Sequence, residues 1–329
     1  MRGNKYIGTV SGLYINYILF GMVNIILASH MSFLSEQLNT DKSGVSFLVA
    51  AMGMGRLLTL YIASVLSDKF GRKPFVLGAS ILFIVFLVGI PLSPSVPVAV
   101  VFSFLAGVAI SMSDSGTYPA LMEAFPKTPG SATVLVRGFV SVGSTLLPLI
   151  IVYFMNHEIY YGYSFFLPAL VFLFSFIILS KMKFPSQSAQ GQNSVKNELN
   201  PEMNYVSKPK FWQEGVCLII IGFTGQALLY ILQLWLPTFG QEVVGLNEAN
   251  SLKLLSYYSI GSLASVITLV LVLHRIVKPV TVLLIYPGNF DYRTLIFIRF
   301  SVFNKYHYHF FCDWFFHLRG STISPNGYE

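Results

Sequence analysis

The chain has 329 residues, of which 54% are hydrophobic and only 11% are charged, and its formal net charge at pH 7 is +7. This composition excludes an ordinary soluble domain, in which about 25% of residues are charged. A positive charge can indicate nucleic-acid binding, but here the basic residues alternate with long apolar runs. No nucleic acid is therefore expected as a partner, and the lipid bilayer is the expected surrounding.

Eight apolar runs follow one another along the chain. Crossing about 30 Å of hydrocarbon requires about 20 residues at a rise of about 1.5 Å per residue. The runs are apolar on every side rather than amphipathic, which is typical of membrane helices. They cover residues 7–29, 44–67, 75–92, 96–121, 132–155, 161–179, 216–239 and 252–273. The sequence therefore predicts an all-α polytopic membrane protein.

The basic residues predict which side of the membrane each loop faces. Most lysines and arginines outside the runs lie at the start of the chain or in even-numbered loops, whereas the odd-numbered loops are richer in acidic residues. By the positive-inside rule, the N-terminus is expected to be cytoplasmic and the protein to span the plasma membrane. Cys217 and Cys312 offer no disulfide framework.

The predicted spans are grouped into segments. Residues 1–180 hold the first six runs, and residues 181–210 form a polar stretch that is expected to be a cytoplasmic linker. Residues 211–287 hold two more runs and the start of a third. Lys73-Pro74 and Lys278-Pro279 each open a run, and the same offset aligns the first run with the seventh. This weak repeat favours two parallel halves, as in secondary transporters.

The loop between the second and third runs carries a motif. It reads Ser-Val-Leu-Ser-Asp-Lys-Phe-Gly-Arg-Lys-Pro over residues 64–74. This resembles the loop signature of the major facilitator superfamily, Gly-x-x-x-Asp-x-x-Gly-Arg-x-Lys/Arg, with serine for the first glycine and proline for the last basic residue. The resemblance covers about residues 1–287. It implies a six-helix N-terminal half followed by part of a C-terminal half, with alternating access to a cavity between the halves.

The same resemblance implies a gating loop made of Asp68, Gly71, Arg72 and Lys73. Gly71 permits a tight turn. Asp68 can accept hydrogen bonds from Arg72 and face the positive end of a neighbouring helix. The other interpretation is an ordinary charged loop at the membrane edge.

Three charged residues fall inside predicted spans, namely Arg56, Asp114 and Arg137. A charge in hydrocarbon costs at least about 2.5–3.5 kcal/mol, so each should face a partner or an aqueous cavity. Asp114 and Arg137 lie at similar depth and are expected to meet, with Glu123 and Arg137 as a shallower pair. One interpretation is structural pairing within the first half. The other is that Arg56 or Arg137 binds an anionic solute while Asp114 couples its movement to protons.

Polar side chains also occur in the first and seventh runs. Asn16 and Asn24 are eight residues apart, while Gln226, Tyr230 and Gln233 recur at spacings of four and three. If the two runs are equivalent, these side chains are candidate cavity walls that hydrogen-bond a polar solute. Hydrogen bonding between helices, without a solute, explains them equally well.

The pattern of spans stops near Pro287. Residues 288–329 mix charged residues, histidines and aromatic residues in a way that suits neither a span nor an amphipathic helix. Some of the codons that could encode this tail, when read in a frame shifted by one base, encode long runs of apolar residues. We therefore predict an out-of-frame tail and a chain that does not transport. The other interpretation is a divergent or short protein whose tail packs at the membrane surface.

The resulting functional prediction is a secondary active transporter of a small polar solute, with an anionic solute among the options and H⁺ as the coupling ion. No cofactor is expected, and the sequence has no phosphate-binding loop, metal-ligand cluster or nucleophile–base pairing that would indicate an enzyme. One alternative is a drug or metabolite exporter of the same superfamily, although the fifth run lacks the Gly-Pro-x-x-Gly-Gly pattern of drug–proton antiporters. The other is a membrane fragment that does not transport.

Overall fold

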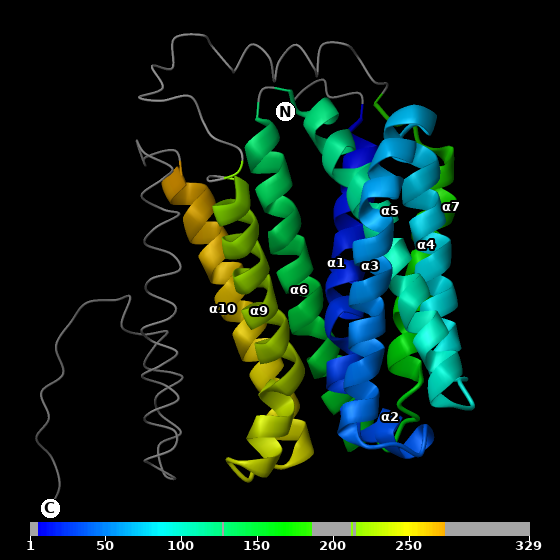
Figure 1. Cartoon of the computed structure of the whole chain (residues 1–329), viewed down its shortest axis with the longest axis vertical. Helices are drawn as coiled ribbons and strands as arrows, with labels where there is room; N and C mark the ends of the chain where they lie inside the picture. The colour runs from blue at the N-terminus through cyan, green and yellow to red at the C-terminus, as the bar shows by residue number, and fades with distance from the viewer. Residues whose placement is uncertain (1–5, 127, 186–211, 213–214, 274–329) are drawn as a thin grey trace, which may run out of the picture. The chain divides into compact units, whose positions relative to one another are not determined.

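A computed structural model describes residues 6–126, 128–185, 212 and 215–273. All regular secondary structure in these residues is helical, as Figure 1 shows. The helices are α1 (Ile7–Ser29), α2 (Met31–Gln37), α3 (Lys42–Phe70), α4 (Arg72–Gly89), α5 (Val96–Ala124), α6 (Pro129–Asn156), α7 (Tyr163–Lys181), α9 (Val216–Glu242) and α10 (Glu248–Leu273). The all-helical fold predicted from the sequence is confirmed, and each of the eight runs lies on a long helix.

Among the described residues, six helices are long and apolar enough to cross a membrane: α1 and α3 to α7. With 27 and 26 residues, α9 and α10 are also long enough. The short helix α2 was not expected, and α4 begins three residues before the predicted run at residue 75. The chain divides into a unit of residues 1–271 and a unit of residues 272–329. The predicted tail 288–329 and most of the predicted linker 181–210 lie outside the described residues.

The helices define two ends of the bundle. At the His30 end, α1 stops, α2 lies at the lower edge of Figure 1, and α3 begins. At the Gly71 end, α3 stops and α4 begins. Gly71 has φ +91°, a left-handed conformation that side chains other than glycine rarely adopt, which confirms that the loop turns tightly at this glycine. Asp41 caps the start of α3 by accepting a hydrogen bond from Gly44 N at 2.9 Å.

Close helix crossings depend on glycine. A Cβ atom at Gly107 of α5 would lie 2.0 Å from Met52 O of α3. A Cβ atom at Gly143 of α6 would lie 1.8 Å from Ile18 O of α1. Because lipid tails provide no hydrophobic drive for association, such close backbone approach is a main source of packing energy between membrane helices. These crossings fix α3 against α5 and α1 against α6.

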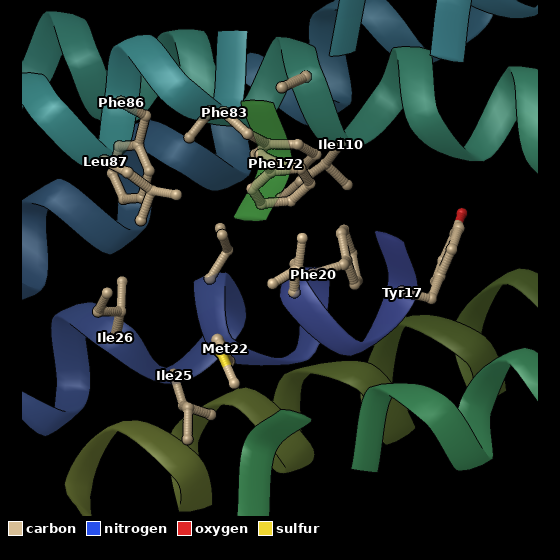
Figure 2. Packing of buried hydrophobic residues seen from close by; sticks show 14 of the residues in the cluster. Tyr17, Phe20, Met22, Ile25, Ile26, Phe83, Phe86, Leu87, Ile110 and Phe172 are labelled. Atoms are coloured by element: carbon tan, nitrogen blue, oxygen red, sulfur yellow. The ribbon is translucent and has the colours of Figure 1, made fainter. Parts of the chain in front are cut away.

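Helix α1 is the most buried of the six spans. Within its apolar segment 78% of the residues are buried, against 28–44% in the other five. Figure 2 shows Phe20 of α1 facing Phe83 and Phe172, which come from α4 and α7. The ring centroids of Phe20 and Phe83 are 6.1 Å apart, and those of Phe83 and Phe172 are 5.0 Å apart. This aromatic core holds α1, α4 and α7 together and sets the position of the polar residues on α1.

The His30 end is held by neutral hydrogen bonds. His30 is fully buried, with Nδ1 at 2.8 Å from Ile26 O and Nε2 at 2.6 Å from Ser164 Oγ. Because a carbonyl oxygen only accepts, Nδ1 carries the proton. The one hydroxyl proton of Ser164 is shared between Nε2 and Tyr161 O, which lies 2.6 Å from Ser164 Oγ. Burial lowers the pKa of His30 to about 4. The ring is therefore neutral near pH 7.

Candidate functional site

The middle of the bundle holds a buried ion pair. Arg56 Nη2 of α3 lies 3.0 Å from Asp114 Oδ2 of α5, and the two side chains are 30% and 12% exposed. The hydroxyl of Tyr17 of α1 donates to Asp114 Oδ1 at 2.7 Å. Both carboxylate oxygens of Asp114 therefore have a donor, as a charge in the membrane interior requires.

Tyr230 extends this group of residues to α9. Arg56 Nη1 donates to the Tyr230 hydroxyl at 3.4 Å. We call Tyr17, Arg56, Asp114 and Tyr230 the Asp114 cluster. It joins α1, α3 and α5 to α9, which follows the predicted linker.

The local sequence explains why Arg56 reaches Asp114. Gly55, the residue before Arg56, packs against the backbone of α5, where an added Cβ atom would lie 2.2 Å from Phe104 O. Ser111 Oγ also donates to Arg56 O at 2.9 Å. Because the α3 and α5 backbones are so close, the guanidinium crosses the interface directly to the carboxylate.

Arg137 is placed differently from the prediction. Asp114 was expected to pair with Arg137, but it pairs with Arg56 instead. Arg137 on α6 is exposed, and its side chain forms no hydrogen bond or ion pair with any residue of the described ranges.

The loop at the Gly71 end forms a second charged cluster. Arg72, which is 9% exposed, pairs with Asp68 and with Glu123 of α5, where Arg72 Nη2 and Glu123 Oε1 are 3.3 Å apart. Glu123 was expected to pair with Arg137, and its partner is Arg72 instead. Lys73 Nζ donates to Ser180 O at 2.6 Å and to Met182 O at 3.0 Å, which satisfies carbonyls at the end of α7. We call Asp68, Arg72 and Glu123 the Gly71-end cluster.

The amide side chains predicted to line a cavity lie in different places. Asn16 is 5% exposed and accepts a hydrogen bond from Ser175 Oγ of α7 at 2.5 Å, so it joins two helices. Asn24 is partly buried, and its Oδ1 is buried without a hydrogen-bond partner. Eight residues at about 3.6 residues per turn leave an offset of about 80°, so these two side chains do not share one narrow face. On α9, Gln226 is exposed and Gln233 is partly buried.

Two functional contacts were missed in the sequence. Tyr17 lies in the first run, but nothing in the run shows that its hydroxyl reaches Asp114 on α5. Tyr118 of α5 packs edge-on against Tyr17, with ring centroids 5.9 Å apart. In the described ranges no three His, Cys, Asp or Glu side chains are grouped so that they could hold a metal ion.

The family model for the Major Facilitator Superfamily matches residues 13–302, and the chain belongs to this superfamily. It is 54% identical over 281 residues to the uncharacterized MFS-type transporter YfkL of Bacillus subtilis (strain 168), which covers 85% of this chain and 70% of the relative. It is 40% identical over 275 residues to the inner membrane transport protein YdiN of Escherichia coli (strain K12), covering 84% of this chain and 64% of that protein. The chain thus spans about two-thirds of the length of these relatives, and its family consists of transporters rather than enzymes.

Solved structures share the fold. The crystal structure of a D-xylose-proton symporter has a TM-score of 0.65 and 15% sequence identity, covering 82% of this chain and 70% of that chain. The partially occluded inward open conformation of the xylose transporter XylE from E. coli has a TM-score of 0.63 and 13% identity, covering 83% of this chain and 72% of that chain. At this identity the likeness extends to the fold alone.

Proposed function

We propose that these helices belong to a proton-coupled secondary transporter that moves a small polar solute by alternating access, with an anionic solute included in that class. The observation that carries the proposal is the bonding of Asp114 to Arg56 and Tyr17, with Arg56 also reaching Tyr230 of α9. A carboxylate in the membrane interior is a functional group by default, because an unused charge there is costly. Proton symport by a protein of the same fold supports proton coupling for this chain.

The proposed mechanism begins with the protonation of Asp114. A neutral carboxyl group no longer attracts the Arg56 guanidinium, so the 3.0 Å ion pair loses its electrostatic stabilisation. Arg56 then redistributes its hydrogen bonds toward Tyr230 or toward a bound solute. Because Tyr230 belongs to a helix after the linker, this exchange changes the relative stability of the two access states.

The Gly71-end cluster is the proposed gate. Arg72 is buried and held by two carboxylates, while the Asp68 side chain is 67% exposed. An exposed carboxylate at a helix end can change partners at low cost. We place this end in the cytoplasm and the protein in the plasma membrane, following the distribution of lysine and arginine in the loops.

Uptake into membrane vesicles under an imposed pH gradient tests the proposal. The panel contains labelled neutral and anionic solutes. The protein is a version in which the tail after Pro287, which we predict to be out of frame, is replaced by the translation of the alternative frame. Asp114→Asn is expected to abolish accumulation driven by the gradient, whereas Glu242→Gln, in an exposed ion pair outside both clusters, should preserve the dependence on it. Accumulation by the Asp114→Asn variant at the parental level would contradict the proposal.

The 329-residue chain itself is expected not to transport, because residues 288–329 are predicted to be out of frame and their sequence suits neither a span nor an amphipathic helix. Cells that express only this chain are compared with cells that carry the empty vector. Uptake of any panel solute above that control would overturn this expectation.

A further inference from the structure

A cavity of about 470 Å³ lies at the His30 end, and it shares no residue with the Asp114 cluster or the Gly71-end cluster. This volume is within the range of about 300–1,000 Å³ that is typical of small-molecule sites. Its walls come from α2, α6, the loop after α6 and the starts of α7 and α10. Because α10 follows the predicted linker, both halves of the chain contribute to this cavity.

The charged groups that line the cavity are carboxylates. Glu158 comes from the loop after α6, and Glu248 is the first residue of α10. His30 also lines the cavity, but it is neutral near pH 7 because burial lowers its pKa to about 4. No lysine or arginine of the described residues is part of the lining. The cavity therefore attracts cations.

Aromatic rings form another part of the wall. The rings of Phe33 and Tyr161 are stacked, with centroids 5.3 Å apart, and the ring of Tyr160 is tilted by 57° against Tyr161 at 4.9 Å. The faces of aromatic rings attract organic cations such as substituted ammonium ions. Calcium instead requires six to eight oxygen ligands. Two carboxylates beside three aromatic rings suit an organic cation better than a metal ion.

The backbone at Glu158 gives an independent reason to assign its side chain a role. Glu158 N donates to Met155 O at 3.2 Å, and Ile159 N donates to Phe154 O at 2.9 Å, which is the Schellman pattern at the end of a helix. In this pattern the residue at the position of Glu158 is usually glycine, because its φ is positive, and here it is +54°. Ending α6 does not require a glutamate, and its side chain lines the cavity.

We propose that this cavity binds an organic ammonium ion that carries an aromatic or other apolar group. The ammonium group is held by Glu158 and Glu248 through charge-assisted hydrogen bonds, and the apolar group packs against the rings of Phe33 and Tyr160. Since the two carboxylates belong to different halves, an occupant that contacts both joins the halves at the His30 end.

Thermal unfolding of the full chain in detergent tests the proposal with three probes of the same shape. Phenethylamine is a cation near pH 7, 2-phenylethanol is neutral, and phenylacetate is an anion. Sodium chloride equalises the ionic strength. Phenethylamine is expected to raise the unfolding midpoint in a saturable way, because a ligand that binds the folded state stabilises it. No shift with phenethylamine, or equal shifts with all three probes, would overturn the proposal.

Three variants locate the site. Glu158→Gly suits the positive φ, so this variant should fold, and it should raise the phenethylamine concentration that gives half the maximal shift by about tenfold. Glu248→Gln should have an effect of similar size. Glu36→Gln removes the same charge from an exposed position of α2 outside the cavity, and it should change this concentration by less than about twofold. Parental affinity in Glu158→Gly, or an equal loss in Glu36→Gln, would overturn the proposal.

A free amine and the headgroup of an ethanolamine lipid share the ammonium chemistry of this site. Lysophosphatidylethanolamine distinguishes them. If it removes the shift caused by phenethylamine, the ammonium site takes the lipid headgroup, and if the shift persists, the site takes a free amine. We expect the free amine, because the phosphate of the lipid would lie close to the same two carboxylates and be repelled by them.

Discussion

The two arginine-centred clusters use the same chemistry in different surroundings. In the Asp114 cluster, Arg56 faces a carboxylate that is 12% exposed and contacts α9 through Tyr230. In the Gly71-end cluster, Arg72 is bound by Glu123 and by Asp68, which is 67% exposed, and all three residues belong to α3, α4 and α5. The Arg72–Glu123 pair, whose side chains are 9% and 14% exposed, is as buried as the Arg56–Asp114 pair. The two clusters differ in the exposed carboxylate of Asp68 and in the contact with α9.

This difference teaches how burial assigns roles to similar ion pairs. Breaking a buried pair leaves a charge without solvent, so the pair resists disruption until a proton removes the charge. Separating an exposed carboxylate from its partner changes the free energy little, because water replaces the lost contact. Asp114 is therefore the carboxylate that we propose senses protons, and the exposed Asp68–Arg72 pair is the contact that we propose opens and closes.

The largest expected effect comes from removing the buried carboxylate. Asp114→Ala should lower the free energy of unfolding by about 3 kcal/mol, the low end for breaking a buried pair, because Arg56 keeps some exposure. The double variant Arg56→Met with Asp114→Leu should recover most of this loss, since no unpaired charge remains. Titration with SDS in mixed micelles measures both values. A single variant as stable as the parent would show that the pair is not buried as described.

The His30 end provides a neutral reference for the two charged clusters. The folded-state pKa of His30, about 4, lies below the ordinary value of 6.5. Between these two pH values the imidazole is protonated in the unfolded chain and neutral in the folded chain. Stability should therefore be unaffected above about pH 6.5 and should fall by roughly 3 kcal/mol as the pH decreases to about 4. The other titratable groups that line the cavity beside His30 are Glu158, Tyr160, Tyr161 and Glu248.

Thermal denaturation as a function of pH measures this effect. His30→Gln should flatten the decline between about pH 6.5 and pH 4, because glutamine does not titrate. A decline of unchanged steepness in this variant would assign it to other groups.

A smaller effect is expected at the Gly71-end cluster. Glu123→Gln should lower the free energy of unfolding by about 1 kcal/mol, because Arg72 keeps its pair with Asp68 and glutamine still offers an oxygen. The same SDS titration provides the measurement. A loss equal to that of Asp114→Ala would remove the contrast between the clusters.

The smallest effect is expected for the exposed ion pair between the halves at the His30 end. Lys42 Nζ lies 2.6 Å from Glu242 Oε1, and the side chains are 34% and 61% exposed. Removing either partner should change the free energy of unfolding by less than about 1 kcal/mol, and added salt should reduce even that. The charge-reversed pair Lys42→Glu with Glu242→Lys is the matched control. A loss above about 2 kcal/mol, which is twice the upper bound for exposed pairs, would contradict this ranking.

The sequence predicts the helices and the tight turn because both depend on local patterns. Apolar runs of bilayer length locate the spans, and the Asp-x-x-Gly-Arg motif identifies Gly71, whose φ of +91° bears out the turn. Partner choice depends instead on which helices cross and how closely. Asp114 pairs with Arg56 because Gly55 and Gly107 let α3 and α5 approach, and depth alone did not distinguish Arg56 from Arg137. Asn16 faces Ser175 because the aromatic core sets the rotation of α1, which the spacing of two asparagines does not encode.

Infrared spectroscopy of the purified chain during a pH titration tests the central claim most directly, because it detects the protonation of a buried carboxyl group without requiring a known solute. The account predicts a carboxylic-acid band that appears on acidification, persists in Glu123→Gln and is missing in Asp114→Asn. A band that is unchanged in Asp114→Asn would contradict the assignment of the transported proton to this residue.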